Sequence, residues 1–140
     1  MDDSKVVNMF HKEMVGHTSD IHCINVLADG NIISSSKDKT IKIWDIKKCE
    51  AIMTLEGHND CVQTIAVLDN GDFASGSYDK TIKIWCSKTG ALKRTINGHK
   101  NWITSIRSFK KGQLISGSRD ETIKIWNYKT GELVKTLTGK

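Results

Sequence analysis

The fold is decided by the stretch Ser75-Gly76-Ser77-Tyr78-Asp79-Lys80-Thr81-Ile82-Lys83-Ile84-Trp85. The same stretch recurs, with few changes, from Ser34 to Trp44 and from Ser116 to Trp126. A Gly-His pair stands upstream of each copy, with its histidine at position 17, 58 or 99, so successive pairs are 41 residues apart (58 − 17 and 99 − 58). The chain of 140 residues is therefore built from three copies of one unit.

Short extended segments are expected within each copy. In the run Thr40-Ile41-Lys42-Ile43-Trp44 the two isoleucines fall on one face of a strand, while the lysine and the tryptophan fall on the other. Ala28-Asp29-Gly30 predicts a tight hairpin turn before this run, because glycine tolerates a positive φ. Asn70-Gly71 and Lys111-Gly112 occupy the same place in the later copies. No proline interrupts these segments, which removes one usual reason to reject central strands.

A 41-residue interval that is opened by Gly-His and closed by Trp resembles the WD40 repeat family. The resemblance covers nearly the whole chain, from about Asn8 to Lys140. It implies an all-β fold with three four-stranded antiparallel blades of a β-propeller, comprising residues 16–56, 57–97 and 98–140. Residues 1–15 are expected to form an N-terminal tail that contains one extra outer strand, Met9 to Met14.

The resemblance also implies a buried, hydrogen-bonded tetrad of histidine, serine, aspartate and tryptophan in each blade. A carboxylate accepts a hydrogen bond from imidazole, imidazole engages a hydroxyl, and a buried indole N–H needs an acceptor, so these residue types suit one another. The matching residues are His17, Ser34, Asp38 and Trp44 in the first copy, His58, Ser75, Asp79 and Trp85 in the second, and His99, Ser116, Asp120 and Trp126 in the third. We expect these tetrads to have a structural role.

A serine, a histidine and an aspartate in each copy could instead be interpreted as a catalytic triad. A triad needs one cluster with an oxyanion hole, whereas the same set recurs three times here, which favours structure over catalysis. The three histidines are expected on separate blades, so no metal site shared by them is expected. The four cysteines form no C-x-x-C pair, which argues against a zinc site and suits reduced thiols. The sequence therefore predicts no enzyme, no cofactor and no metal site.

Function is expected at the positions that vary between copies. In the WD40 family three such positions per blade line the top face, where peptides commonly dock. Carried over, they are Asp20, His22 and Lys37 in the first copy, Cys61, Gln63 and Tyr78 in the second, and Trp102, Thr104 and Arg119 in the third. Because Trp, Tyr and Arg are enriched at binding hot spots, the predicted partner-binding patch is Trp102, Arg119 and Tyr78, with Lys37 and His22 beside it. The alternative is that these are variable exposed side chains without a dedicated ligand.

The strings Ser-Gly-Ser-Tyr-Asp and Ser-Gly-Ser-Arg-Asp also resemble the substrate-binding propellers of F-box ubiquitin ligase receptors. In those propellers an Arg or Tyr before the turn aspartate helps to hold a phosphorylated peptide. Since arginine offers a bidentate pair of donors to phosphate, an acidic or phosphorylated ligand is expected. The sequence departs from those receptors because it contains no F-box and only one arginine in the patch.

Composition narrows the expected partners and location. The formal net charge of +5 is spread over lysines in all three copies, so solvated blade edges explain it better than a nucleic-acid interface does. No apolar run approaches the roughly 18 residues of a membrane span, and the N-terminus carries no visible secretory signal. We expect a cytoplasmic or nuclear location, and neither nucleic acid nor a membrane as a partner.

Three copies are too few to close a propeller, which typically has about four to eight blades. The chain is therefore either part of a longer propeller or, if complete, one half of a six-bladed homodimer in which Met9 to Met14 and Leu133 to Leu137 compete for one edge. The sequence predicts a non-enzymatic scaffold that binds a protein or peptide. One alternative is a substrate-recognition or regulatory module of a larger multidomain enzyme, such as an F-box ubiquitin ligase receptor or a propeller-bearing kinase. Another is a truncated product with no function of its own.

Overall fold

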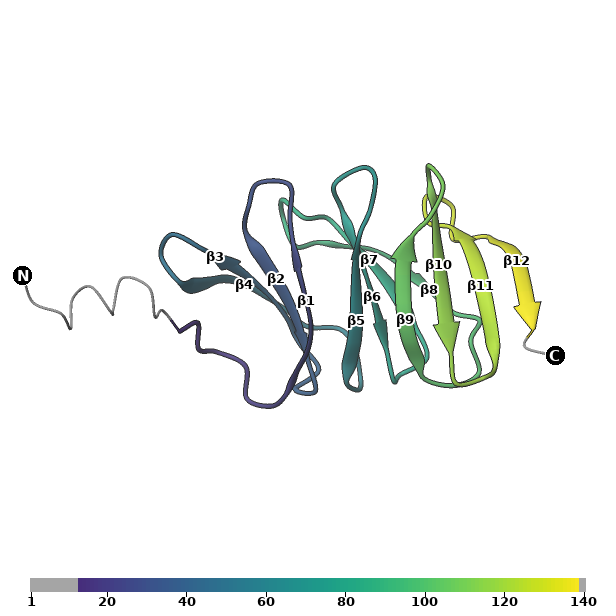
Figure 1. Ribbon diagram of the computed structural model, residues 1–140, viewed down its shortest axis with the longest axis horizontal. Coiled ribbons are helices and arrows are strands. Elements are labelled where there is room, and N and C mark those ends of the chain that lie inside the picture. The colour runs from purple at the N-terminus through teal and green to yellow at the C-terminus, as the bar shows by residue number, and fades with distance from the viewer. Residues whose placement is uncertain (1–12, 139–140) are drawn as a thin grey trace, which may run out of the picture.

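The computed structural model describes residues 13–138, which form twelve β-strands and contain no helix long and apolar enough to cross a membrane. The strands make three four-stranded antiparallel sheets that stand one beside the next along the long axis of the molecule (Figure 1). The predicted all-β fold of three antiparallel blades is confirmed, and the array formed by the described residues is open. The extra strand predicted at Met9 to Met14 falls largely outside the described residues, and residues 13–20 lie in no strand.

Each blade is a meander, in which strands that follow one another along the chain are also neighbours in the sheet. Blade 1 comprises β1 (Ile21–Val26), β2 (Ile32–Ser36), β3 (Ile41–Asp45) and β4 (Glu50–Leu55). Blade 2 comprises β5 (Val62–Val67), β6 (Phe73–Ser77), β7 (Ile82–Trp85) and β8 (Leu92–Ile96). Blade 3 comprises β9 (Ile103–Ser108), β10 (Gln113–Ser118), β11 (Thr122–Asn127) and β12 (Leu133–Thr138).

Two opposite edges of the array carry the loops. We call the edge at which β1, β5 and β9 begin and β2, β6 and β10 end the top face; it lies at the lower side of Figure 1. The hairpins from β1 to β2, from β5 to β6 and from β9 to β10 lie at the upper side of Figure 1, which we call the hairpin edge. Gly71 turns the second hairpin with a φ of 90°, a conformation that suits glycine.

The hydrophobic core lies in the two seams between blades. The seam between blades 1 and 2 buries Ile33, Ile41, Ile43, Leu55, Val62, Ile65, Phe73 and Trp85. The seam between blades 2 and 3 buries Ala74, Ile82, Ile84, Ile96, Ile103, Ile106, Leu114 and Trp126. The two-residue alternation of a strand places the isoleucines of β3 and β7 on the face that meets the next blade. Among residues 13–138, blade 2 therefore buries both of its faces, whereas blades 1 and 3 each leave one face open.

Small and large side chains fit together across the seams. A Cβ atom added at Gly76 would lie 2.6 Å from Cγ2 of Ile103, far closer than two carbon atoms pack, so this position requires glycine. One repeat earlier the same two positions hold Ser35 and Val62, both fully buried. Serine is larger than the glycine of the later repeat, and valine is smaller than its isoleucine, so the two changes compensate. At Gly117, on the open face of blade 3, no atom of the described residues lies within 4 Å of the added Cβ.

Candidate functional site

Each blade contains a chain of four hydrogen-bonded side chains that links its second and third strands to the loop before its first strand. In blade 2, Nδ1 of His58 lies 2.8 Å from Oδ2 of Asp79, and Nε2 of His58 lies 2.7 Å from Oγ of Ser75. The indole N–H of Trp85 donates to the same serine oxygen at 2.8 Å. The distances agree within 0.1 Å in the other two blades, where the residues are His17, Asp38, Ser34 and Trp44, and His99, Asp120, Ser116 and Trp126.

The carboxylate at one end of the tetrad and the indole N–H at the other end fix the direction of each hydrogen bond. Asp79 is a carboxylate and can only accept, so His58 donates from Nδ1 and, as a neutral imidazole, accepts at Nε2. Ser75 then donates its proton to Nε2 and keeps a lone pair for the indole N–H of Trp85. Each donor of the tetrad therefore finds an acceptor, as buried polar groups require.

A threonine two residues after each aspartate is a fifth member that the sequence interpretation missed. In blade 2 the Thr81 hydroxyl donates to Oδ1 of Asp79 at 2.7 Å, and the Thr81 N–H donates to the same oxygen at 2.9 Å. Thr40 and Thr122 make the same two bonds in the other blades. The signal was present in the sequence, because Asp-x-Thr occurs in all three copies and short polar side chains of this kind bond to nearby backbone groups in turns.

The turn aspartates are held as carboxylates. Burial by itself would raise the pKa of Asp79, but hydrogen bonds from His58, from Thr81 and from the backbone N–H of Asn59 lower the pKa well below its ordinary value. The same balance lowers the pKa of Asp38 and of Asp120. Each turn is therefore built around a negative charge at neutral pH.

The tetrads lie inside the blades and present no group to a substrate. The His58 side chain is 1% exposed, and Ser75 is fully buried. Because the Ser75 hydroxyl is already bonded to His58 and Trp85, it is not the exposed nucleophile that covalent catalysis needs. Within residues 13–138 no three His, Cys, Asp or Glu side chains form a group that could hold a metal ion.

Three side chains from blades 2 and 3 form a stack on the top face. The rings of Tyr78 and Trp102 lie almost parallel, with their centroids 3.8 Å apart and an interplanar angle of 8°. The guanidinium carbon of Arg119 lies over the Trp102 ring, 4.9 Å from its centroid, which is within the range of a cation–π interaction. We call these three residues, all of them members of the predicted partner-binding patch, the top-face stack.

Two loops in each blade position the stack. Tyr78 directly follows β6 and Arg119 directly follows β10, and their backbone N–H groups donate to the carbonyls of Cys61 and Trp102 at 3.0 and 2.9 Å. Each turn is thus tied to the loop that precedes the first strand of its own blade. Tyr78 then reaches across the seam to Trp102, so the stack joins blade 2 to blade 3.

Lys37 and His22 lie on the same side of the array but outside the stack. Lys37 takes the position of Tyr78 in blade 1, and its backbone N–H donates to the carbonyl of Asp20 at 2.9 Å. Burial raises the pKa of the Cys61 thiol, and the nearby charge of Lys37 opposes that shift. His22 is exposed at a β-bulge in β1. In the described part of the chain, no hydrogen bond or ring contact joins either residue to the stack.

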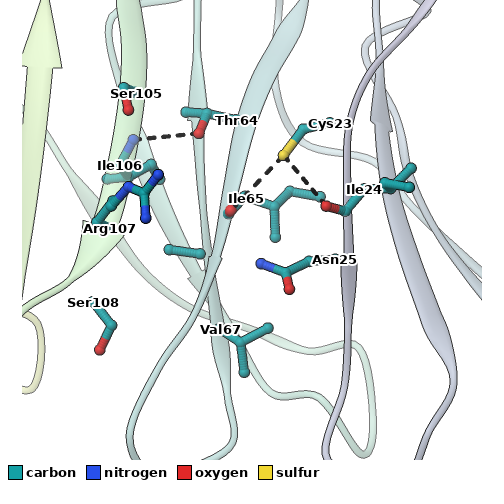
Figure 2. Close-up of a pocket in the computed structure, with 11 residues that line it drawn as sticks. Cys23, Ile24, Asn25, Thr64, Ile65, Val67, Ser105, Ile106, Arg107 and Ser108 are labelled. Carbon is teal, nitrogen blue, oxygen red and sulfur yellow. Dashed lines mark hydrogen bonds between the residues drawn. The ribbon is translucent and has the colours of Figure 1, made fainter.

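A cavity of about 490 Å³ runs along the innermost strands β1, β5 and β9 (Figure 2). Bonds between blades line it: the Ile106 N–H donates to Oγ1 of Thr64 at 3.3 Å, and the Cys23 thiol donates to the Ile65 carbonyl at 3.9 Å. Arg107 is the charged residue of its lining. Since these polar groups serve to connect the blades, the top-face stack is the stronger candidate for binding.

The family described as WD domain, G-beta repeat matches this chain over residues 8–45, 49–86 and 90–127. The second matched segment begins before β4 and ends after β7, so the sequence unit is offset by one strand from the blade. WD40 repeat proteins generally act as scaffolds for protein interactions, and the family is generally non-enzymatic.

Individual proteins match over parts of their length. The guanine nucleotide-binding protein subunit beta of Schizosaccharomyces pombe is 35% identical over 54 residues, which are 39% of this chain and 18% of that protein. The solved structures of U3-55K and of the RRP9 WD40 repeats each have a TM-score of 0.84, with 29% and 30% identity, and the match covers 90% of this chain and 41% of each of theirs. This chain therefore spans less than half the length of these relatives. With its three matched repeats and its blades, the chain belongs to the WD40 repeat family.

Proposed function

We propose that this chain is a protein-interaction scaffold that binds a partner polypeptide on its top face, with an acidic or phosphorylated group of the partner held by Arg119. The observation that carries the proposal is the top-face stack, which gathers Tyr78, Trp102 and Arg119 across one seam. These are the residue types enriched at binding hot spots. Aromatic rings supply a large contact area, and they lose little side-chain entropy when a ligand binds.

The Arg119 side chain is exposed and can reach a ligand. Among residues 13–138 no hydrogen bond or ion pair uses its guanidinium. The adjacent carboxylate, Asp120, accepts from His99, from both donors of Thr122 and from the Lys100 N–H, so its lone pairs are already engaged. The guanidinium therefore keeps its paired N–H donors for a carboxylate or a phosphate.

Contact with Trp102 prepares the guanidinium for that role. A long arginine side chain loses conformational entropy when a ligand immobilises it. Part of this loss has already occurred in the free chain, because the cation–π contact holds the guanidinium over the indole ring. The stack thus favours affinity for an anionic group that approaches along the seam.

The proposal can be tested with an array of peptides, each made with serine, glutamate or phosphoserine at its central position, followed by calorimetry on the tightest binder. We expect the glutamate or phosphoserine forms to bind and the serine forms not to bind. Arg119→Ala should weaken binding by about tenfold or more, the size of one charge-assisted hydrogen bond. Arg119→Lys should restore only part of the affinity, because lysine is a point charge without the planar fork.

Arg107→Ala is the matched control, since Arg107 is an exposed arginine on β9 of the same blade but outside the stack. It removes the same charge and should leave the dissociation constant unchanged. An Arg119→Ala variant that binds the same peptides as tightly as the wild-type chain would refute the proposal. An equal loss in both variants would show that only net charge matters.

A further inference from the structure

The seam between blades 1 and 2 contains a groove at the hairpin edge, at the opposite end of the strands from the top face. Its volume is about 790 Å³. Leu27, Ile43 and Met53 of blade 1 form apolar parts of the lining, and the turn after β7, which includes Ser87, forms another part. Ile52, also in the lining, is 47% exposed. We call this space the seam groove.

The next seam, between blades 2 and 3, shows what fits in such a place. The cavity that remains there is about 290 Å³, and Tyr128 forms part of its lining. Tyr128 is 3% exposed and belongs to one buried cluster with Leu68 and Ile84. Its hydroxyl donates to Asp69, and burial together with this bond raises the pKa of Tyr128 to about 12. One aromatic side chain of the protein itself, Tyr128, is therefore buried in this seam beside the remaining cavity.

The two spaces are equivalent by the repeat. Each of the six residues that line the smaller cavity has a counterpart 41 positions earlier (70 − 29 for the first pair) in the lining of the seam groove. The pairs are Asn70 and Asp29, Ile84 and Ile43, Lys93 and Ile52, Arg94 and Met53, Tyr128 and Ser87, and Lys129 and Lys88. The exchange that opens the groove is serine for tyrosine, because it removes a whole ring from the seam.

We propose that the seam groove binds a phenylalanine-like side chain of a partner polypeptide, in the place that Tyr128 takes in the next seam. The ring would lie against Leu27 and Ile43, the counterparts of Leu68 and Ile84, which belong to the buried cluster of Tyr128. Burial of its apolar surface supplies the driving force. The thioether of Met53, where the other seam has an arginine, adds a favourable sulfur–aromatic contact.

The ring has no hydroxyl because the groove has no acceptor at the position where the next seam holds one for its phenol. In the next seam that acceptor is Asp69, and its counterpart in the seam groove is Ala28. A tyrosine in the groove would lose its hydrogen bond to water without gaining the carboxylate partner that Tyr128 has. The groove should therefore prefer phenylalanine to tyrosine.

This site is separate from the top-face stack. The stack lies where β6 and β10 end, and the groove lies at the hairpin between β1 and β2 and the turn after β7. In Figure 1 the ends of β6 and β10 lie at the lower side of the array, and the hairpin between β1 and β2 lies at the upper side. The groove proposal therefore stands or falls independently of any role for Arg119.

The test uses the full chain with ¹³C-labelled methionine and isoleucine methyl groups, and N-acetyl-phenylalanine amide as the probe. We expect the probe to shift the Met53 and Ile43 methyl signals saturably, with a Kd on the order of 1 mM, as the usual affinity per heavy atom implies. Ser87→Tyr fills the groove and should weaken binding by about tenfold or more. Ala28→Asp supplies the missing acceptor and should reverse the preference toward N-acetyl-tyrosine amide.

Ile46→Tyr is the matched control, because Ile46 is the counterpart of Ser87 and is 48% exposed on the open face of blade 1. It adds the same side chain without filling the groove, so probe binding should be unchanged. The Ile84 methyl signal, from the other seam, reports whether each variant keeps its fold. The proposal is overturned if the probe shifts neither groove methyl, or if a folded Ser87→Tyr variant binds the probe as tightly as the wild-type chain.

Discussion

Two adjacent serines in β2 show how strongly the effect of one hydroxyl depends on its surroundings. Ser34 Oγ is bonded to His17 and to Trp44. Ser35 Oγ is buried and has no hydrogen-bond partner among the described residues. Ser35 stands at the position that Gly76 holds one repeat later, where a side chain has no room. A bonded buried hydroxyl contributes to stability, whereas an unbonded one lowers it.

Alanine at these two positions should therefore have opposite effects. Ser34→Ala leaves His17 and the indole N–H of Trp44 without their partner and should lower the free energy of unfolding by about 1 to 3 kcal/mol. Ser35→Ala removes the unbonded oxygen but keeps the Cβ atom, and should raise the free energy of unfolding by about 0.5 to 1 kcal/mol. Urea unfolding followed by tryptophan fluorescence measures both changes. A loss of stability in Ser35→Ala would mean that its hydroxyl has a partner, such as a buried water.

At the scale of one element, the turn between the second and third strands of each blade depends on its aspartate. In blade 2, Asp79 accepts from His58, Thr81 and Asn59, so one carboxylate connects the turn to the loop before β5. Asp45, at the end of β3, has a local role instead, since within residues 13–138 its carboxylate accepts only from the backbone N–H groups of the turn that follows. The charge of Asp79 should therefore matter to the whole blade and that of Asp45 to one turn.

Acid should destabilise the blades through the turn aspartates. The folded chain holds the pKa of Asp79 below its unfolded value, so the unfolded state binds more protons once the pH falls below about 4, and the free energy of unfolding then decreases. Asp79→Ala should lower the free energy of unfolding at neutral pH by about 2 kcal/mol and should reduce the further loss on acidification. Asp45→Ala, as the control, should cost less at neutral pH, because the Asp45 carboxylate holds only the turn that follows β3 among the described residues. Urea titrations across this pH range would contradict the assignment if the two variants behaved alike.

At the scale of the whole molecule, the two open faces of the array are complementary. Across a closed seam Gly76 meets Ile103, whereas Gly117 on the open face of blade 3 meets no described atom within 4 Å. Ile21 takes the repeat position of Ile103 and is 51% exposed on the open face of blade 1. The two halves of one further seam therefore lie at opposite ends of the same molecule.

Because the two complementary faces lie at opposite ends of the molecule, we expect copies of this chain to associate end to end, with blade 3 of one against blade 1 of the next. Such a head-to-tail interface is heterologous. Sedimentation velocity over a concentration series should show a mass that rises above that of one chain. Ile21→Asp places a charge in the new seam and should restore the monomer. Ile52→Asp, at an exposed isoleucine outside the end faces, is the control and should still associate. A wild-type chain that is monomeric at every concentration would rule this out.

Much of the candidate site could be named from the sequence, because each member recurs or varies at a fixed place in the repeat. His58, Ser75, Asp79 and Trp85 are found this way, and the structure joins them by hydrogen bonds. Thr81 recurs equally and could have been included. Tyr78 and Trp102 could be named as variable positions, but their ring contact depends on two loops of different blades that meet across a seam.

By itself, the sequence determined the fold class, the repeat and the strand faces, because a 41-residue interval and a two-residue alternation are properties of the chain read in order. The tertiary structure alone decided what lies between the blades. Ser87 and Tyr128 occupy the same repeat position, yet one borders an open groove and the other fills a seam. The reason is physical: the space at a seam depends on the side chains that two neighbouring blades bring face to face, and no single repeat contains both sides of it.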